Sequence, residues 1–206
     1  KNNPNLEIDL READLSETDL KGVYLVGANL SGANLEFAQL VSSQLHRADL
    51  SNVNLQLADL TKADLSKINA IGADLRNANL TEADLSKANL IGTNFREAIL
   101  RRANLSQTQL NRTNLSEADL VETNLNQADL SNASLYEAEV SGAYLYQANF
   151  FKANLSDAHL NSTYLLEANF CEAILSKTDL RWSNLFKADL RWSDLKEANF
   201  RGANLS

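Results

Sequence analysis

Large apolar residues recur at every fifth position along almost the whole of this 206-residue chain. Of 40 positions at this spacing, from Leu10 to Leu205, all but six hold Leu. The six exceptions are Ala70, Phe95, Val140, Phe150, Phe170 and Phe200. Two residues before each position stands Ala, Ser, Thr or Val, except at Ile8 and Ile68, and the residue directly before is Asp or Asn in 29 cases. The chain is therefore an uninterrupted five-residue repeat from Ile8 onward.

A period of five fits neither a simple helix nor a flat strand. On an α-helix, successive leucines would rotate around the cylinder instead of forming one apolar stripe. On a flat strand they would alternate between the two faces. Residues two apart do share one side of an extended segment, so each Leu and the small residue before it can both point inward. The chain must then turn a corner every five residues, which predicts a stacked, closed coil.

The glycines mark the predicted corners, because all seven lie two residues after a Leu-type position. They are Gly22, Gly27, Gly32, Gly72, Gly92, Gly142 and Gly202. Glycine and Asn tolerate the positive φ that the third residue of a type II turn requires, and Asn52, Asn77 and Asn132 share this phase. Since Glu, Lys and Trp also occur there, we expect a mixture of turn types rather than corners that depend on glycine.

Echoes in the sequence indicate how many corners make one coil. Twenty-residue echoes favour four corners: Tyr144 with Tyr164, Phe150 with Phe170, and Ile71 with Ile91. A ten-residue echo, Arg181–Ser183 with Arg191–Ser193, leaves other numbers open. One exchange inside the predicted core is compensated, because Ala70 is undersized where Ile68 on the same side is oversized, and cores tolerate swaps that conserve volume.

Strings such as Ala83–Lys87 and Ala103–Gln107 resemble the A-(D/N)-L-x-x motif of the pentapeptide-repeat family. The resemblance implies an all-β fold, a right-handed quadrilateral parallel β-helix of about ten coils, about 48 Å long at the usual strand spacing. It covers 8–206, which we interpret as a single domain. We interpret 1–7, where Pro4 is the sole proline, as an N-terminal cap or linker remnant. By analogy with the family, we expect the chain to be part of a larger bacterial, cyanobacterial-like protein.

Composition narrows the classes of function. The formal net charge of −8 argues against direct nucleic-acid binding. No apolar run approaches the roughly 20 residues of a membrane-spanning helix, so membrane insertion is not expected, and the lack of a targeting segment slightly favours a cytoplasmic location. Cys171 is the single cysteine and no Cys/His cluster accompanies it, so neither a metal nor a cofactor is expected. Cys171 should point outward and remain inert beside Glu172.

Two patterns of polar residues could in principle bind a cation or act as an acid–base cluster. The Asp/Asn positions are interpreted as corner residues that bond neighbouring backbone, in preference to a cation-binding ladder. Glu139, His159 and Asp179 are twenty apart, so we expect them to stack as a hydrogen-bonded ladder on the surface. No nucleophile lies beside them, and we predict no catalytic residues and no enzyme activity.

Large aromatic residues that point outward are candidates for partner contacts. The candidate surface consists of Tyr24, Tyr144, Tyr146, Tyr164, Phe186, Phe151, Trp182 and Trp192. Ile71, Ile91 and Cys171 are expected to lie on the wall that carries Phe151 and Trp192. The sequence therefore predicts a non-enzymatic interaction or scaffold module with an unknown protein partner. End-to-end self-association through uncapped terminal coils is a further expectation.

One wall of the predicted coil is acidic, with ten acidic against four basic residues, a net charge of −6. The candidate acidic face contains Asp14, Glu17, Glu36, Glu117, Glu137, Asp157, Asp194 and Glu197. Asp74 and Glu97 complete the acidic set of this wall. Some members of the family that this chain resembles protect type II topoisomerases such as gyrase by mimicking DNA, and this is the alternative function. The charge is dilute, about one per 8 Å against one per roughly 1.7 Å for duplex DNA.

Overall fold

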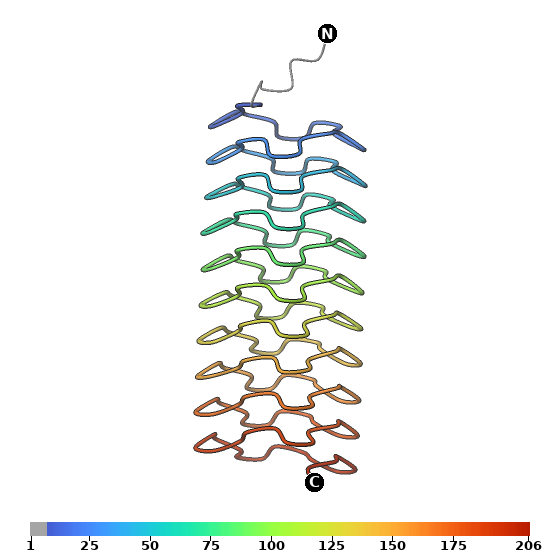
Figure 1. The fold of residues 1–206 in the computed structure, drawn as a ribbon, viewed down its shortest axis with the longest axis vertical. Helices are drawn as coiled ribbons and strands as arrows, with labels where there is room; N and C mark the ends of the chain where they lie inside the picture. Colours follow the sequence, from blue (N-terminus) through green and yellow to red (C-terminus); the bar gives the residue numbers. More distant parts are fainter. Residues whose placement is uncertain (1–7) are drawn as a thin grey trace.

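Residues 8–206 of the computed structural model form one column of stacked coils (Figure 1). Parallel β-bridges join residues twenty apart, beginning with Asp9 to Asn29 and ending with Asn184 to Asn204. The bridges are isolated, so this part of the chain contains neither a continuous strand nor a helix with bounds to define. Residues 1–7, the predicted cap or linker, lie outside the described residues. One coil therefore spans twenty residues, the length of four repeats.

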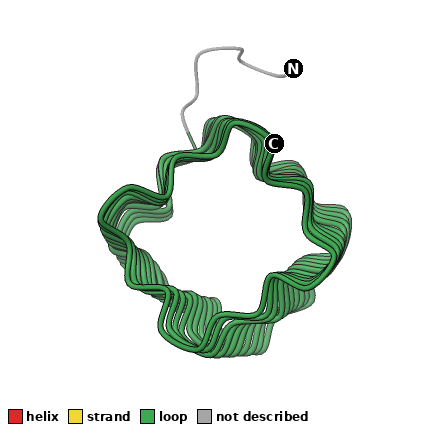
Figure 2. Ribbon diagram, turned by 90° about the horizontal axis from the view of Figure 1, so that it is seen from below, coloured by secondary structure: helices red, strands yellow, loops and turns green. Residues whose placement is uncertain are grey.

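The coils are held together by a regular backbone hydrogen-bond ladder. At one rung the Leu50 N–H donates to the Asn69 carbonyl at 2.6 Å, and the Asn52 N–H donates to the Ile71 carbonyl at 2.9 Å. In the opposite direction the Asn54 N–H donates to the Ala33 carbonyl at 3.0 Å. Because one bridging residue lies between consecutive turns, the pairing stays a single bridge on each segment. Viewed along the axis, the coils superimpose as one closed contour (Figure 2).

Every corner from Glu12 to Gly202 has the same backbone conformation at its third residue, with φ between 53° and 75°. Thirty-two of these residues are not glycine, so the expected mixture of turn types is wrong, whereas independence from glycine is confirmed. The reason lies in the ladder. The N–H of this third residue donates to a carbonyl in the coil that follows; the Lys62 N–H, for example, donates to the Thr81 carbonyl at 2.9 Å. That bond requires one orientation of the turn whatever the side chain.

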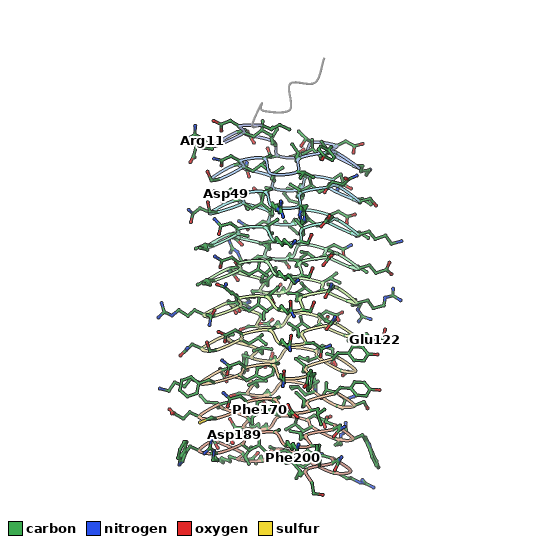
Figure 3. The ribbon with its side chains drawn as sticks, in the orientation of Figure 1. Arg11, Asp49, Glu122, Phe170, Asp189 and Phe200 are labelled. Atoms are coloured by element: carbon green, nitrogen blue, oxygen red, sulfur yellow. The ribbon has the colours of Figure 1, made fainter. Side chains whose placement is uncertain are left out.

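The interior is filled by the Leu-type residues and the small residues two positions earlier. They are almost completely buried from Leu25 to Leu185 and less buried in the coils at either end. Phe150 and Phe170 stack in the core with ring centroids 4.8 Å apart and an interplanar angle of 1°. Phe170, labelled in Figure 3, is completely buried. Ile68 and Ala70 are both buried, as a compensated exchange requires. The Oδ1 atom of Asn69, between them, is buried without a hydrogen-bond partner.

Candidate interaction surfaces

The Asp and Asn residues before the Leu positions hold the corners. All of them except Asn69 accept a hydrogen bond from the backbone N–H two residues later. Asn side chains also bond the coil before, as from Asn54 Nδ2 to Asn34 Oδ1 at 2.9 Å. The structural interpretation is confirmed. Within 8–206 no group of three or more His, Cys, Asp or Glu side chains is arranged to hold a metal ion.

Glu139, His159 and Asp179 are bridged in consecutive coils, as the sequence predicted. The predicted side-chain ladder is wrong, because among the described residues these three form no hydrogen bonds with one another. Each carboxylate instead bonds the residue two positions later: Glu139 accepts from Ser141, and Asp179 accepts from Arg181 at 2.6–3.0 Å. The hydrogen bond from Arg181 lowers the pKa of Asp179, and the nearby His159 adds to this effect.

Cys171 occupies an outward-facing turn position, as expected, but it is buried, with only 9% of its surface exposed. The side chain is short, and larger residues, Phe151 and Arg191, occupy the same place in the coils on either side. A shallow depression elsewhere on the surface is lined by Arg101, Arg102 and the adjoining Val121–Glu122, and it holds no nucleophile.

Five large apolar side chains gather in three consecutive coils and form what we call the aromatic patch. It consists of Tyr144, Tyr146, Tyr164, Leu166 and Phe186. Tyr144 and Tyr164 stack with centroids 5.0 Å apart and an interplanar angle of 4°, and they are 47% and 53% exposed. Tyr146, Leu166 and Phe186 follow one another at the same place in successive coils. The candidate surface omitted Leu166 because it was restricted to aromatic residues, although the twenty-residue register points to it.

The other four predicted aromatic residues lie apart from the patch. Tyr24 occupies the same column six coils earlier. Phe151 lies beside the Lys152 ammonium, 4.9 Å from the ring centroid. Trp182 extends over Gly202 in the next coil, and Trp192 lies half a coil from Trp182 and is 76% exposed.

The predicted acidic face is discontinuous. Glu97, Glu117, Glu137 and Asp157 follow one another in consecutive coils, Asp74 stands apart from them beside Arg76, and the remaining residues lie near the two ends of the described column. Asp14, Glu17 and Glu36 are near one end, and Asp194 and Glu197 are near the other.

The four stacked acids also have local partners. Arg96 lies 3.2 Å from Glu97 and 2.8 Å from Glu117, and Lys177 lies 3.9 Å from Asp157. The Tyr136 hydroxyl donates to Glu137 at 2.6 Å, a bond that raises the pKa of Tyr136. We name the column that contains these acids the glutamate column. From one end it reads Glu17, Phe37, Leu57, Asn77, Glu97, Glu117, Glu137 and Asp157.

A second column of long polar side chains was not anticipated from the sequence, and we name it the lysine–glutamine column. It reads Arg47, Lys67, Lys87, Gln107, Gln127, Gln147, Glu167 and Lys187. Within 8–206 its first three cations form no ion pair with a carboxylate. The amides that follow form a ladder, with Nε2-to-oxygen distances of 2.9, 3.1 and 2.8 Å from Gln107 through to Glu167. The sequence does contain a signal for this column, because residues of the same chemical class recur in it at twenty-residue spacing.

Comparisons with known proteins complete the description. The sequence profile of the family described as pentapeptide repeats matches six segments between residues 8 and 206. A search of curated proteins gives no match. Among solved structures, HetL, a pentapeptide repeat protein involved in heterocyst differentiation regulation from the cyanobacterium Nostoc sp. strain PCC 7120, is 34% identical. That match covers 96% of this chain and 89% of HetL, with a TM-score of 0.48.

A trypsin-treated variant of QnrB1, a plasmid-mediated fluoroquinolone resistance protein, is 16% identical with a TM-score of 0.63. The match covers 86% of this chain and 89% of QnrB1, and it speaks for the fold alone. No helix in the described part of this chain is long and apolar enough to cross a membrane. Pentapeptide-repeat proteins fold as right-handed β-helices and generally serve as structural or interaction modules. With the profile matching nearly all of 8–206 and the 34% identity to HetL, this chain belongs to the pentapeptide-repeat family.

Proposed function

We propose that this chain is a non-enzymatic interaction module that presents the aromatic patch to a protein partner. In this proposal 8–206 form one domain, a four-sided column of about ten coils that serves as a rigid support, within a larger bacterial protein. The observation that carries the proposal is the clustering of exposed apolar side chains in three consecutive coils. Clustered, exposed aromatic residues are typical of protein-binding sites, whereas single exposed apolar residues are ordinary.

The patch is supported by features that favour recognition over a purely structural role. The core beneath it is already filled by buried residues such as Leu145 and Leu165, so Tyr144 and Tyr164 are not needed to close it. Their stacking fixes both rings before a partner arrives, which lowers the entropy cost of binding. The Gln147 and Glu167 side chains, joined by a 2.8 Å hydrogen bond, run beside the patch and supply a polar rim.

The test is capture of a partner by the immobilised rod, followed by affinity measurement with the purified partner. We expect replacement of Tyr144 and Tyr164 together by Ser to weaken binding at least tenfold, as for hot-spot residues worth about 2 kcal/mol or more. The matched control replaces the isolated Tyr24 and Trp192 by Ser and should bind normally. Equal binding by all three proteins, each with unchanged circular dichroism, would exclude the patch as the recognition surface.

The alternative function is a DNA-mimicking modulator of a type II topoisomerase. It is favoured by one observation, the four consecutive acids from Glu97 to Asp157 in the glutamate column. Their spacing along the axis is about 4.8 Å, wider than the 3.4 Å per strand of DNA, and Arg96 neutralises part of the charge.

Purified gyrase separates the two functions. Inhibition of supercoiling by the rod, with binding that falls steeply between 50 and 300 mM salt and is lost in a Glu117→Gln, Glu137→Gln variant, would establish the mimic. We expect no gyrase binding at either salt concentration, because the acidic run is short and partly paired.

A further inference from the structure

The lysine–glutamine column and the glutamate column lie on opposite sides of the rod. Each residue of one column is ten positions, half a coil, from a residue of the other. Both columns occupy the third turn position, where positive φ projects the side chain outward from a corner. Most members of both columns are exposed; only Glu167 and Asp157 are half-buried. Both columns therefore can contact another molecule, and their residues repeat with the same rise.

We propose that the two columns bind each other between two copies of this chain, with the rods side by side and antiparallel. In the best register Lys67 faces Glu137 of the second copy, and the other rungs follow in steps of one coil. The eight rungs pair Arg47 with Asp157, Lys67 with Glu137, Lys87 with Glu117, Gln107 with Glu97, Gln127 with Asn77, Gln147 with Leu57, Glu167 with Phe37, and Lys187 with Glu17.

The complementarity is both electrostatic and apolar. The three cations without an ion pair meet three carboxylates. Of the three amides, Gln107 meets a carboxylate and Gln127 an amide, whereas Gln147 and Glu167 lie opposite Leu57 and Phe37. Phe37 and Leu57 are 47% and 46% exposed in the single rod. In this register they come next to Tyr146 and Leu166, which directly precede Gln147 and Glu167 in the chain. The pairing thus covers apolar surface on both copies and gives part of the aromatic patch an occupant.

Most neighbouring charges do not oppose this register; the exception is Glu36, which precedes Phe37 and would lie beside Glu167. Arg96, Lys177 and the Tyr136 hydroxyl already contact the acids of the glutamate column, yet each carboxylate can accept further hydrogen bonds. The column before the lysine–glutamine column, from His46 through Ser66 to Phe186, carries no fixed charge. Opposite it would lie the column that contains Arg76 and Arg96, whose guanidinium groups meet uncharged side chains.

Other antiparallel registers are worse. A shift by one coil in one direction places Glu167 opposite Glu17, and a shift in the other direction places Arg47 opposite Lys177. The preferred register also leaves the two rods almost flush along their length. Eight rungs span about 34 Å at the usual coil spacing, a narrow strip typical of weak, transient association. Because two different surfaces meet, each copy keeps one column free and rods can add in a row.

This inference rests on the proposed function as an interaction module, and it names a second copy of this chain as one partner. The experiment is sedimentation velocity of the purified chain from 1 to 500 µM at 50 and 500 mM salt. We expect concentration-dependent association that the higher salt suppresses, since exposed ion pairs are screened. Lys67→Glu and Glu137→Lys should each weaken association roughly tenfold, because each converts an attraction into a repulsion.

Mixing the two single variants restores the contact, since Glu at position 67 then faces Lys at position 137. The matched control is Arg112→Glu, an exposed third turn residue in a different column with the same charge change, and it should associate normally. Failure of the mixture to recover association, or equal weakening by Arg112→Glu, would overturn the register. A chain that stays monomeric to 500 µM would overturn the self-association itself. Neither outcome affects capture of a different protein through Tyr144 and Tyr164, so the proposed function is tested separately.

Discussion

The stacked pair Phe150 and Phe170 offers a direct measure of how strongly neighbouring coils are coupled through the core. Both rings are fully buried, with centroids 4.8 Å apart and planes 1° from parallel. Leu is the usual residue at this position, so Phe→Leu keeps the site apolar and removes the ring. Each single replacement should cost about 1 to 2 kcal/mol of unfolding free energy, with the stack worth about 0.5–1.5 kcal/mol beyond buried area.

A double-mutant cycle isolates the stack. We expect Phe150→Leu and Phe170→Leu together to cost less than the sum of the single variants by about 1 kcal/mol. For a chain of this size that coupling corresponds to a shift in Tm of about 2–4 °C. Phe95 is equally buried but has Leu at the same place in the coils on either side, and serves as the control. Phe95→Leu combined with Phe170→Leu should be additive.

The assay is urea unfolding followed by far-ultraviolet circular dichroism. Trp182 and Trp192 provide a second probe, reporting the C-terminal coils by fluorescence. The curves are fitted with a nearest-neighbour scheme because repeat proteins depart from two-state behaviour as they lengthen. A coupling energy below about 0.3 kcal/mol, within the usual error of additivity, would refute the view that the aromatic stack joins the coils.

Three further predictions test the corners, the core and the surface charge. The hydrogen bond from Arg191 lowers the pKa of Asp189 to about 2, so this pair stabilises the fold above the ordinary carboxyl pKa and loses its effect as the pH falls through 2. The urea midpoints of the parent and Asp189→Asn should therefore differ at pH 5 and converge near pH 1.5. A difference that stays constant between these pH values contradicts this. Gly202→Ala and Gly22→Ala should each cost about 1 kcal/mol through positive φ, but only Gly202→Ala, whose new Cβ would clash with the Trp182 ring, should shift the tryptophan emission. An emission spectrum of Gly202→Ala equal to that of the parent would argue against that contact. Ile68→Ala should destabilise the fold by about 2–5 kcal/mol and Ala70→Leu by about 1–3 kcal/mol. The double variant restores the usual pattern of a small residue followed by Leu, and its Tm should match or exceed that of the parent. If the two costs add instead, the two sites are independent.

Much of the fold follows from local sequence. A five-residue apolar period with a small residue two places earlier defines which side chains point inward, and neither a helix nor a flat strand can satisfy it. The position of every glycine marks the residue with positive φ. The roles of the Asp and Asn residues also follow, because each bonds backbone only two residues away, and Ile68 with Ala70 can be read as compensating neighbours.

Other features depend on contacts between residues twenty apart, which only the tertiary structure decides. One turn conformation prevails at every corner because the ladder to the next coil requires it, whereas intrinsic preferences of Glu, Lys and Trp pointed to a mixture. Cys171 is buried by the coils on either side, not by its own surroundings in the chain. Glu139 and Asp179 bond their near neighbours instead of His159, because a hydroxyl or guanidinium two residues away is in reach. The sequence thus determines which residues face outward, and the stacking of coils decides which of them meet.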